Sequence, residues 1–584
     1  MCRYVEQLKV GSSAWLMSGL LLAVGCGGGQ QIVDAADTGS GKDSDSSQDA
    51  GASQERAFVR IEDGALTLGE EAIPFRLQGV TFSNYYWLDA EAFRSSSHHS
   101  PEAYEEVAGW GMNAVQLILT YRLLESDSAP FEYEEEGWRW LDENIAAAEA
   151  AGIYVVLDLL MVAGGDWHDL SLDTLDFDIW SDETLQDRFV ALWQAIASRY
   201  ADEPTVAAYS LLNEPVTDDG TGDAWQNLLK RTVSAIREVD DRHVLIADPL
   251  YGTNGTYTVP DDVDRRILLD DDQVLYDIHF YEPYEYTMQG AHWTGDDSAE
   301  AQQYPDESVV TVTGDLVHGG NTHENPVLPA GTSDWARYEG ILYPVTDSDI
   351  VVSYPAVVCR GDNTGGSAFF DELDIIEYDE NEEMLRTIAS ISITADSLSD
   401  WYPWSSDGTG ELSSVEQGHA DETALMVAGT LETGLFSTQS VLFGVSVGHR
   451  YQINGWMRGE NISDAASCQL SLEFFSLGEG TTQTRRDAAL LHAALDKDLS
   501  FGIENDVPMI VSEFGLMRSC FENDLGGEIW VQDMLDLLDE RALSMFFFTY
   551  HSDAMGIYGD ESQLPSAETV NTPLIRLLQE HLAE

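Results

Sequence analysis

Two short apolar runs that each end in a glutamate constrain the fold of this chain more than any other feature. Residues 206–212 lack a helical period, and Asn213, Glu214 and Pro215 follow them where a buried strand would end. Parallel α/β barrels place their chemistry at the carboxyl ends of such strands. From this run alone, a solvated glutamate at a strand–loop junction explains the pattern equally well.

A second run has the same design. Residues 508–512 lead into Glu513, with Phe514 and Gly515 after it. If both runs belong to one barrel, the two glutamates can face each other across its mouth. Cleavage of a glycosidic bond needs such a pair, with one carboxyl as proton donor and the other as nucleophile or base. The two runs together therefore favour a glycoside-cleaving site over two solvated side chains.

Apolar strand-like runs alternate with amphipathic helical runs along most of the chain. This alternation predicts a parallel sheet, and the number of units favours a closed barrel over an open sheet. Strands are expected at residues 75–83, 113–119, 153–160, 206–212, 243–247, 274–281, 508–513 and 544–550. The rhythm breaks between about residues 290 and 480, where short β-branched and aromatic runs separated by turns are typical of a β-sandwich. The predicted fold is α/β, a (β/α)8 TIM barrel with a jelly-roll-like β-sandwich inserted after strand six.

The strand-end motifs, taken in order, resemble those of glycoside hydrolase family 5, a family of many cellulases and mannanases. The motifs that carry the resemblance are Asn213-Glu214-Pro215, His279-Phe280-Tyr281 and Ser512-Glu513-Phe514-Gly515. Their order and strand contexts match the family's fourth, sixth and seventh strands. The resemblance implies that Glu214 is the general acid/base and Glu513 the nucleophile of a retaining, two-step mechanism that needs no metal or other cofactor.

The resemblance also implies residues that bind the substrate. Asn213 would donate to the sugar 2-hydroxyl, Tyr281 would hydrogen-bond Glu513, and His279 would bond near the acid or the sugar. Further residues expected at the mouth of the barrel are Gln116, Trp87, Trp293, Tyr550 and His551. Each assignment has an alternative. A polar residue of this set can have a purely structural role, and an aromatic one can pack in the core.

Two positions depart from the family pattern. Gln116 stands where strand two normally carries an arginine that pairs with the nucleophile, and Leu160 stands where strand three normally ends in a histidine. Because Gln116 brings no charge, Glu513 loses a partner that would lower its pKa.

These two departures leave two functions open. One is a hydrolase of β-linked glycans, with cellulose-type β-glucan favoured over β-mannan, β-1,3-glucan or glycolipid glycans. The other is a carbohydrate-binding surface lipoprotein with weakened catalysis.

Residues 291–480 resemble jelly-roll carbohydrate-binding modules. Residues 448–459 are similar to the middle strands of such modules and residues 368–377 to the last strand, an order that indicates a circular permutation. A purely structural sandwich fits the pattern nearly as well, and a structural calcium in this insert is left open. Cys359 and Cys468 lie in the insert and could pair in an exported protein, or could be small buried hydrophobic residues.

The first 56 residues predict export and tethering. Residues 1–25 have a basic start and a short apolar core, as in a signal peptide, and the residues before Cys26 resemble a bacterial lipoprotein signal with lipidation of that cysteine. Residues 26–56 have the composition of a flexible linker. The catalytic barrel is assigned to residues 57–290 and 481–584. We expect a monomer that acts on a polysaccharide or oligosaccharide and is lipid-anchored at a bacterial cell envelope or surface, or secreted.

The charge balance excludes two classes of partner. With 28 basic and 104 acidic residues the formal net charge is −76, so the phosphates of nucleic acids and anionic membrane surfaces repel the chain. This composition is typical of proteins that stay soluble in high salt, where ions screen the self-repulsion. We therefore expect the unfolding temperature to rise as salt is added from low ionic strength. A thermal melt that does not change with salt would contradict adaptation to a saline environment.

Overall fold

The structure, a computed structural model, describes residues 56–582 except 84–88, 96–99, 168–174, 261, 292–300, 395–397, 399–400, 404–409, 420–422, 439–440 and 560–567. The predicted signal peptide, Cys26 and nearly all of the predicted linker lie outside the described residues, as do Trp87 and Trp293. Within the described residues, no helix combines the length and the apolar character needed to cross a membrane.

Eight parallel strands close into a barrel. In chain order they are β4 (Gln78–Phe82), β5 (Ala114–Thr120), β8 (Tyr154–Met161), β9 (Val206–Ser210), β10 (Val244–Ala247), β11 (Val274–Phe280), β27 (Met509–Phe514) and β28 (Ser544–Phe547). Every residue of β5, β8 and β9 is buried, because each strand is covered by the barrel interior on one face and by helices on the other. The predicted (β/α)8 barrel is confirmed.

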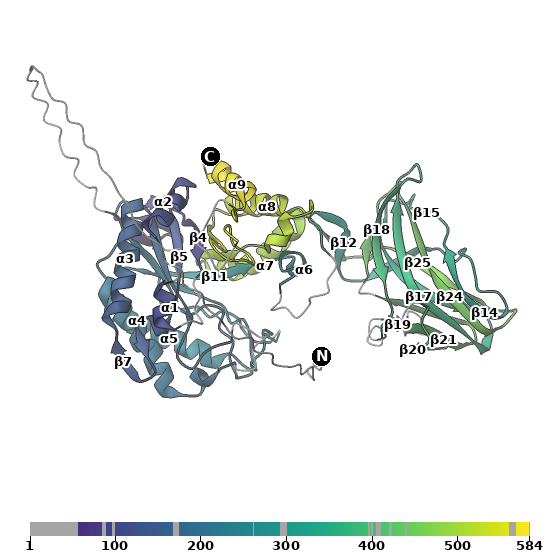
Figure 1. Ribbon diagram of the computed structural model, residues 1–584, viewed down its shortest axis with the longest axis horizontal. Helices are drawn as coiled ribbons and strands as arrows, with labels where there is room; N and C mark the ends of the chain where they lie inside the picture. Colours follow the sequence, from purple (N-terminus) through teal and green to yellow (C-terminus); the bar gives the residue numbers. More distant parts are fainter. Residues whose placement is uncertain are drawn as a thin grey trace, which may run out of the picture. The chain divides into compact units, whose positions relative to one another are not determined.

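Helices cover the outside of the barrel, as Figure 1 shows for α3, α4 and α5. The helices are α1 (Ala90–Ser95), α2 (Pro101–Gly109), α3 (Glu135–Ala151), α4 (Glu183–Tyr200), α5 (Asp223–Arg237), α6 (Tyr284–Thr287), α7 (Ala488–Asn505), α8 (Gly527–Glu540) and α9 (Thr572–Leu582). In α3, Trp138, Leu141 and Ile145 recur at helical spacing and form its buried stripe. Gly152 ends this helix with a left-handed backbone, φ +78°.

A small antiparallel sheet closes the amino-terminal end of the barrel. It consists of β1 (Val59–Glu62), β2 (Ala65–Leu68) and β3 (Ile73–Pro74). Its buried residues Val59, Ile61 and Leu66 pack in one cluster with residues from the starts of the barrel strands, among them Ala114 and Val244. At the other end of the barrel, the carboxyl ends of the strands lead into loops.

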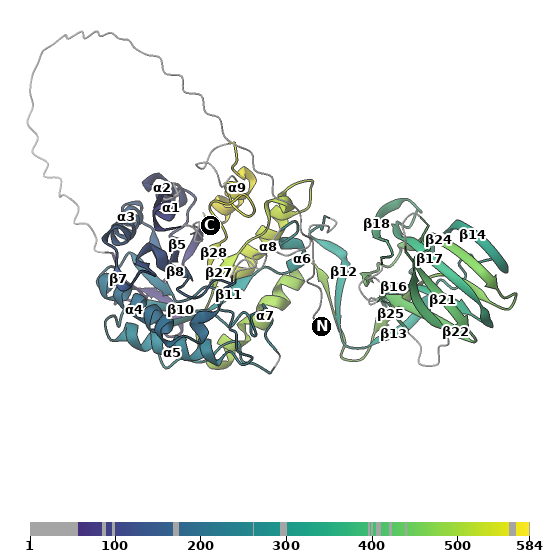
Figure 2. The same ribbon diagram turned by 60° about the horizontal axis from the view of Figure 1, so that its bottom comes forward.

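Between β11 and β27 the chain forms two antiparallel sheets. The first contains β12 (Asp306–Thr313), β13 (Leu316–Asn321), β16 (Ile350–Arg360), β19 (Trp401–Pro403), β22 (Thr433–Thr438), β23 (Phe443–Gly444), β25 (Ser467–Leu477) and β26 (Thr482–Arg486). The second contains β14 (Gly331–Glu339), β15 (Tyr343–Pro344), β17 (Asn363–Tyr378), β18 (Met384–Ile391), β20 (Glu411–Val415), β21 (Ala424–Thr430) and β24 (Arg450–Ile462). Figure 2 shows β14, β24, β17 and β21 side by side in the second sheet.

One cluster of buried side chains draws on both antiparallel sheets. It includes Val357 and Leu472 from the first sheet and Phe370 and Ile453 from the second. Such a shared cluster forms when two sheets bury one face each. That these sheets form a jelly roll of the carbohydrate-binding kind stays a prediction.

A disulfide joins two strands of the first antiparallel sheet. Cys359 of β16 lies directly opposite Cys468 of β25, and their sulfur atoms are bonded, with the Cα atoms 4.0 Å apart. The two cysteines therefore form a disulfide, which was one of the two possibilities for this pair, and not two separate buried thiols. Cys520, by contrast, is a free and buried cysteine.

Candidate active site

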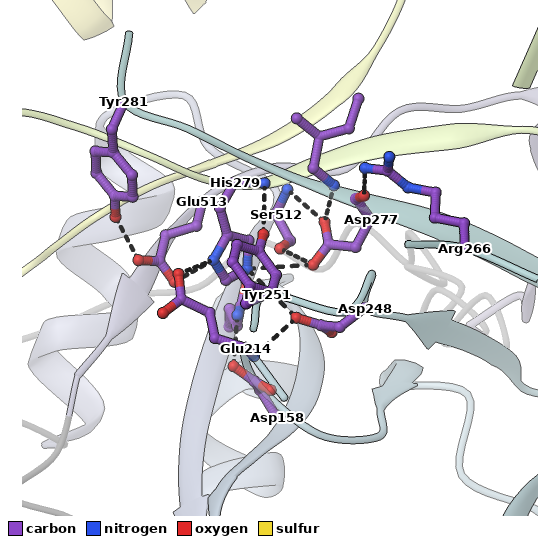
Figure 3. A network of polar contacts seen from close by, with 12 residues as sticks. Asp158, Glu214, Asp248, Tyr251, Arg266, Asp277, His279, Tyr281, Ser512 and Glu513 are labelled. Atoms are coloured by element: carbon purple, nitrogen blue, oxygen red, sulfur yellow. Dashed lines mark hydrogen bonds and ion pairs between the residues drawn. The ribbon is translucent and has the colours of Figure 1, made fainter. Parts of the chain in front are cut away.

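Three strand ends bring Glu214, His279 and Glu513 together, as Figure 3 shows. Glu214 follows β9 in the chain, and His279 and Glu513 are register partners near the ends of β11 and β27. One carboxyl oxygen of Glu214, one of Glu513 and a ring nitrogen of His279 all lie within 4.8 Å of one another. Carboxyl groups about 5–5.5 Å apart suit a double displacement at a sugar carbon. The two glutamates singled out by the sequence therefore meet at the carboxyl end of the barrel.

The backbone of Glu214 is held in a left-handed conformation, with φ +45°. A non-glycine residue pays about 1–3 kcal/mol for such a backbone, which persists only where the surroundings fix it. Here the N–H of Glu214 donates to Asp248 Oδ1 at 3.1 Å, and its carbonyl accepts from Trp167 Nε1 at 2.8 Å. These two contacts hold the strained turn that carries the glutamate, whose Oε1 lies 2.8 Å from His279 Nδ1.

Glu513 lies deeper than Glu214. Its side chain is 10% exposed against 22% for Glu214, and it accepts a hydrogen bond from the Tyr281 hydroxyl, as the sequence predicted. Burial raises the pKa of Glu513 to about 7; the nearby Glu214 adds to the increase, while His279 and the Tyr281 hydroxyl oppose it. The carboxyl of Glu513 is therefore less acidic than an ordinary glutamate.

The raised pKa of Glu513 makes its contribution to stability depend on pH. The folded protein, with a pKa of about 7 at Glu513, binds a proton that the unfolded chain has already lost, so stability falls as the pH rises from the ordinary glutamate value to about 7. We expect Glu513→Gln to increase the free energy of unfolding, by more at pH 8 than at pH 5. Denaturant titrations at both pH values measure this difference, and an equal gain at both would contradict it.

Glu473 provides the matched control, because it is also a buried glutamate but its pKa moves the other way. Burial alone would raise the pKa of Glu473, but hydrogen bonds with His318 and His323 outweigh burial and lower it. Its stabilising contribution is present above the ordinary glutamate pKa and is lost as the pH falls below that value. Glu473→Gln is therefore expected to lose stability at both pH 5 and pH 8.

The other residues predicted to bind substrate divide into two groups. Gln116, inside β5, and Asn213, after β9, are buried, 1% and 5% exposed, and the Gln116 amide donates to Asp158 Oδ2 at 2.7 Å. Tyr550 is 2% exposed, and its hydroxyl donates to Glu106 of α2 at 2.8 Å. The expectation that Tyr550 stacks on a sugar is therefore wrong, because its ring is enclosed by the aromatic core. His551, 4% exposed, is similarly buried.

Sequence reasoning missed two buried aspartates beside His279. Asp248 comes directly after β10 and Asp277 lies inside β11; they are 4% and 0% exposed. The sequence did contain a signal for each. Asp277 is a charged residue inside an apolar strand, and Asp248 is a carboxylate at the end of another strand. Burial raises the pKa of Asp248 well above its usual value, with Asp277 adding to the increase. Burial also raises the pKa of Asp158, to about 6, against hydrogen bonds from Gln116 and Ser210.

These side chains contain two groups whose ligand atoms are close enough to hold a metal ion. One group is Glu214, His279 and Glu513, and the other is Asp248, Asp277 and His279. Both groups share the ring of His279. Its Nδ1 lies 2.8 Å from Glu214 Oε1, and its Nε2 lies 3.3 Å from Asp277 Oδ2. Contacts between the protein groups themselves therefore account for the closeness of these atoms.

A cavity of about 710 Å³ lies at the other end of the barrel. Its lining includes Met509 and Ser544, the first residues of β27 and β28, and Leu499 and Ile503 of α7. In α/β barrels that end serves stability, whereas the carboxyl end carries the chemistry. The carboxylates around His279 are therefore the candidate active site.

Residues 70–320 match the cellulase family, glycosyl hydrolase family 5. The family 5 match includes the barrel strands from β4 to β11 and with them Glu214, His279 and Tyr281. Glu513 lies beyond the matched residues. The motif around Glu214 and the motif around His279 therefore lie in the part of the chain that resembles the family in sequence.

The curated relatives include an endoglucanase, a cellodextrinase and a mannan endo-1,4-beta-mannosidase by name. Endoglucanase C of Acetivibrio thermocellus is 34% identical over 190 residues, which is 32% of this chain and 52% of the relative. Cellodextrinase A of Ruminococcus flavefaciens is 29% identical over 192 residues, 33% of this chain and 54% of the relative. Mannan endo-1,4-beta-mannosidase 8 of Oryza sativa subsp. japonica is 26% identical over 212 residues, 32% and 55% of the two chains. The chain thus spans about half the length of these relatives.

Among solved structures, endoglucanase Cel5A of Thermotoga maritima aligns with a TM-score of 0.43 at 14% identity, over 86% of this chain and 96% of that chain.

Proposed function

We propose that this protein is a retaining glycoside hydrolase that cleaves β-linked glycans, with cellulose-type β-glucan as the favoured substrate. The observation that carries the proposal is the meeting of Glu214 and Glu513, with oxygens within 4.8 Å of one another, at the carboxyl end of the barrel. The family 5 match supports the reaction class. The endoglucanase and cellodextrinase relatives support the substrate class, and the mannosidase relative makes β-mannan the first alternative.

In the proposed first step, the carboxylate of Glu513 attacks the anomeric carbon. The bond from that carbon to the leaving oxygen breaks, and Glu214 gives its proton to that oxygen. The product is a glycosyl ester on Glu513. Tyr281, which donates to Glu513, orients the attacking carboxylate, and Asn213 is the proposed donor to the sugar 2-hydroxyl.

In the proposed second step, Glu214 has become a carboxylate and takes a proton from water. The water oxygen attacks the anomeric carbon, and the ester bond to Glu513 breaks. Because each step inverts the configuration at that carbon, the product keeps the configuration of the substrate. The closeness of the two carboxyls leaves no room for a water between them, which supports this course over a single displacement.

A substrate panel tests the proposal. Wild type and Glu513→Gln are assayed on aryl β-glycosides, soluble β-1,4-glucan, β-mannan and β-1,3-glucan, and the anomeric form of the first product is followed by NMR. We expect release of β-configured sugars from at least one β-1,4-linked substrate by wild type only. An α-configured first product would contradict the retaining course, and equal release by both proteins would contradict the role of Glu513.

A second candidate function is a carbohydrate-binding surface protein with weakened catalysis. Two observations favour it: Glu513 has a pKa of about 7, and Gln116 contacts Asp158 instead of bringing a cation to Glu513. The same panel separates the two functions. Saturable binding of a glycan by wild type without turnover would support the second.

We further propose that the two antiparallel sheets form a carbohydrate-binding sandwich in an exported, lipid-tethered protein. The disulfide Cys359–Cys468 supports export, because such bonds persist in oxidising compartments. Half-buried Trp335 and Trp456, on the paired strands β14 and β24, are the proposed sugar contacts.

The sugar-binding role of this sandwich predicts that Trp335→Ala weakens adsorption to insoluble glycan. We expect an affinity about tenfold lower, since an aromatic contact contributes roughly 0.5–1.5 kcal/mol beyond the area it covers. The measurement is made in the Glu513→Gln background, where substrate persists. Tyr402→Ala, which removes an exposed aromatic ring from the other sheet, is the control. Unchanged adsorption of both variants would contradict the assignment of Trp335 as a sugar contact.

A further inference from the structure

The ring of His279 is surrounded by carboxylates on both sides (Figure 3). Its Nδ1 lies 2.8 Å from Glu214 Oε1 and 3.5 Å from Glu513 Oε2. Its Nε2 lies 3.3 Å from Asp277 Oδ2 and 3.7 Å from Asp248 Oδ1. The side chain is 2% exposed, so bulk water does not solvate either nitrogen. A neutral imidazole has one N–H and can donate to one side only, whereas an imidazolium donates to both.

Asp277 is held in a fixed orientation on the far side of this ring. Its Oδ1 accepts from the backbone N–H of Ile278 at 2.7 Å and of Ser512 at 3.2 Å. Its Oδ2 accepts from the Ser512 hydroxyl at 2.6 Å. These three hydrogen bonds fix the orientation of the Asp277 carboxyl group. The oxygen that faces His279 is therefore held in place by the neighbouring strand β27, which also carries Glu513.

Positive charge is scarce around these carboxylates. Gln116, on the second barrel strand, is neutral and contacts Asp158, so among the described residues the ring of His279 is the basic group that lies beside both glutamates. The titratable groups that face His279 are Asp158 from β8, Glu214 after β9, Asp248 and Tyr251 after β10, Asp277 from β11 and Glu513 from β27. All of these groups are acids. One cation, Arg266, also reaches this network, where it donates to the backbone carbonyl of Asp277 at 2.6 Å. The acids that face the ring nitrogens favour an imidazolium.

We propose that Asp277 is a positioning residue that holds His279 as an imidazolium, and that this ring stabilises the single negative charge of the catalytic pair wherever that charge lies. The inference rests on the proposed function. Before the first step the charge is on Glu513; in the glycosyl ester it is on Glu214. Because Nδ1 faces an oxygen of each, one N–H serves both states while His279 keeps its two protons throughout. Neither step transfers a proton to or from the ring.

The electrostatics of the folded chain agree with this arrangement. Burial by itself would lower the pKa of His279, but Tyr251, Glu513, Asp277 and Glu214 together raise it well above its usual value. Removing the charge of Asp277 weakens that effect. Asp277→Asn keeps the shape of the side chain, and we expect it to lower the pH at which His279 loses its proton by at least one unit.

The test uses the full chain labelled with ¹⁵N-histidine and no substrate. The chain has 13 histidines, so the His279 signals are identified by their loss in His279→Gln. We expect the wild-type shifts of both ring nitrogens to be those of an imidazolium up to pH 8, and those of Asp277→Asn to change to a neutral ring at lower pH. Asp158→Asn, which removes a buried carboxylate without a contact to the ring nitrogens, should shift the titration less. A wild-type ring that is neutral at pH 7 would overturn the proposal whether or not Asp277→Asn folds.

An activity measurement then separates this inference from the proposed function. If the protein is a hydrolase, Asp277→Asn should move the alkaline limb of the kcat/KM profile downward by about one pH unit, because the ring becomes neutral at lower pH, and this gives a tenfold loss at pH values above the limb. Unchanged profiles would overturn the inference while leaving the hydrolase intact. If wild type turns over no glycan, the proposed function fails, and the NMR titration still decides whether Asp277 sets the charge of His279.

Discussion

Replacement of Glu513 by glutamine is expected to lower kcat by roughly 10⁴-fold or more, because an amide cannot form the glycosyl ester of the first step. The variant should remain folded and, by relieving the burial of a charge, should be more stable than wild type at pH 8. Steady-state kinetics on the best substrate of the panel measure the loss. Glu473→Gln, a change of the same chemistry at a buried glutamate of β25, should leave kcat within about twofold of wild type.

A small anion distinguishes loss of the nucleophile from general damage. In Glu513→Gly, azide fits the space left by the side chain and can attack the anomeric carbon of an activated β-glycoside. One displacement then gives an α-glycosyl azide. Absence of any azide product, together with wild-type activity of Glu513→Gln, would contradict the assignment of Glu513 as the nucleophile.

Replacement of Glu214 by glutamine should lower kcat by roughly 10²–10⁴-fold on substrates whose leaving group needs a proton. The loss should be smaller for a dinitrophenyl glycoside in the first step, because that leaving group departs as a stable anion. The second step still lacks its base, so the ester on Glu513 should accumulate and appear as a burst followed by slow turnover. Rapid-mixing kinetics with the two kinds of leaving group measure this difference.

The leaving-group comparison also has an outcome that excludes the acid/base role. Equal losses on alkyl and dinitrophenyl glycosides, with no burst, would place Glu214 in substrate binding or in support of the fold. Azide added to Glu214→Ala should give a β-glycosyl azide, because it attacks the ester already formed and so adds a second inversion. An α product would reverse the roles of the two glutamates.

The barrel could be predicted from the sequence because its strands have a distinctive pattern. The apolar run before Asn213 and the run before Glu513 each lack helical spacing and each end in polar residues, and β9 and β27 were found in those places. The end of a helix also has a local signal in the sequence. Gly152 allows the left-handed backbone conformation with which α3 ends. Periodicity and stop signals are local, so one sequence suffices to find them.

The surroundings of the catalytic pair could be predicted only in part. The sequence indicated that Gln116 brings no cation to Glu513, but not that burial raises the pKa of this glutamate to about 7. The sequence did not place Asp277 beside His279, because the side to which each residue of a closed barrel turns depends on strand tilt and register. Tyr550 was misjudged for a related reason: its hydroxyl reaches Glu106 on α2, a contact between the two ends of the barrel sequence.

The interruption of the barrel between its sixth and seventh strands has a consequence for synthesis. Tyr276 of β11 pairs with Met509 of β27, yet both antiparallel sheets are encoded between them. While the chain emerges from the ribosome, the part that carries Glu214 and His279 must wait, with a strand edge unpaired, until the last two strands arrive. A nascent chain arrested before β27 therefore lacks Glu513 and exposes an unpaired strand edge, so it is the species that most needs protection from aggregation.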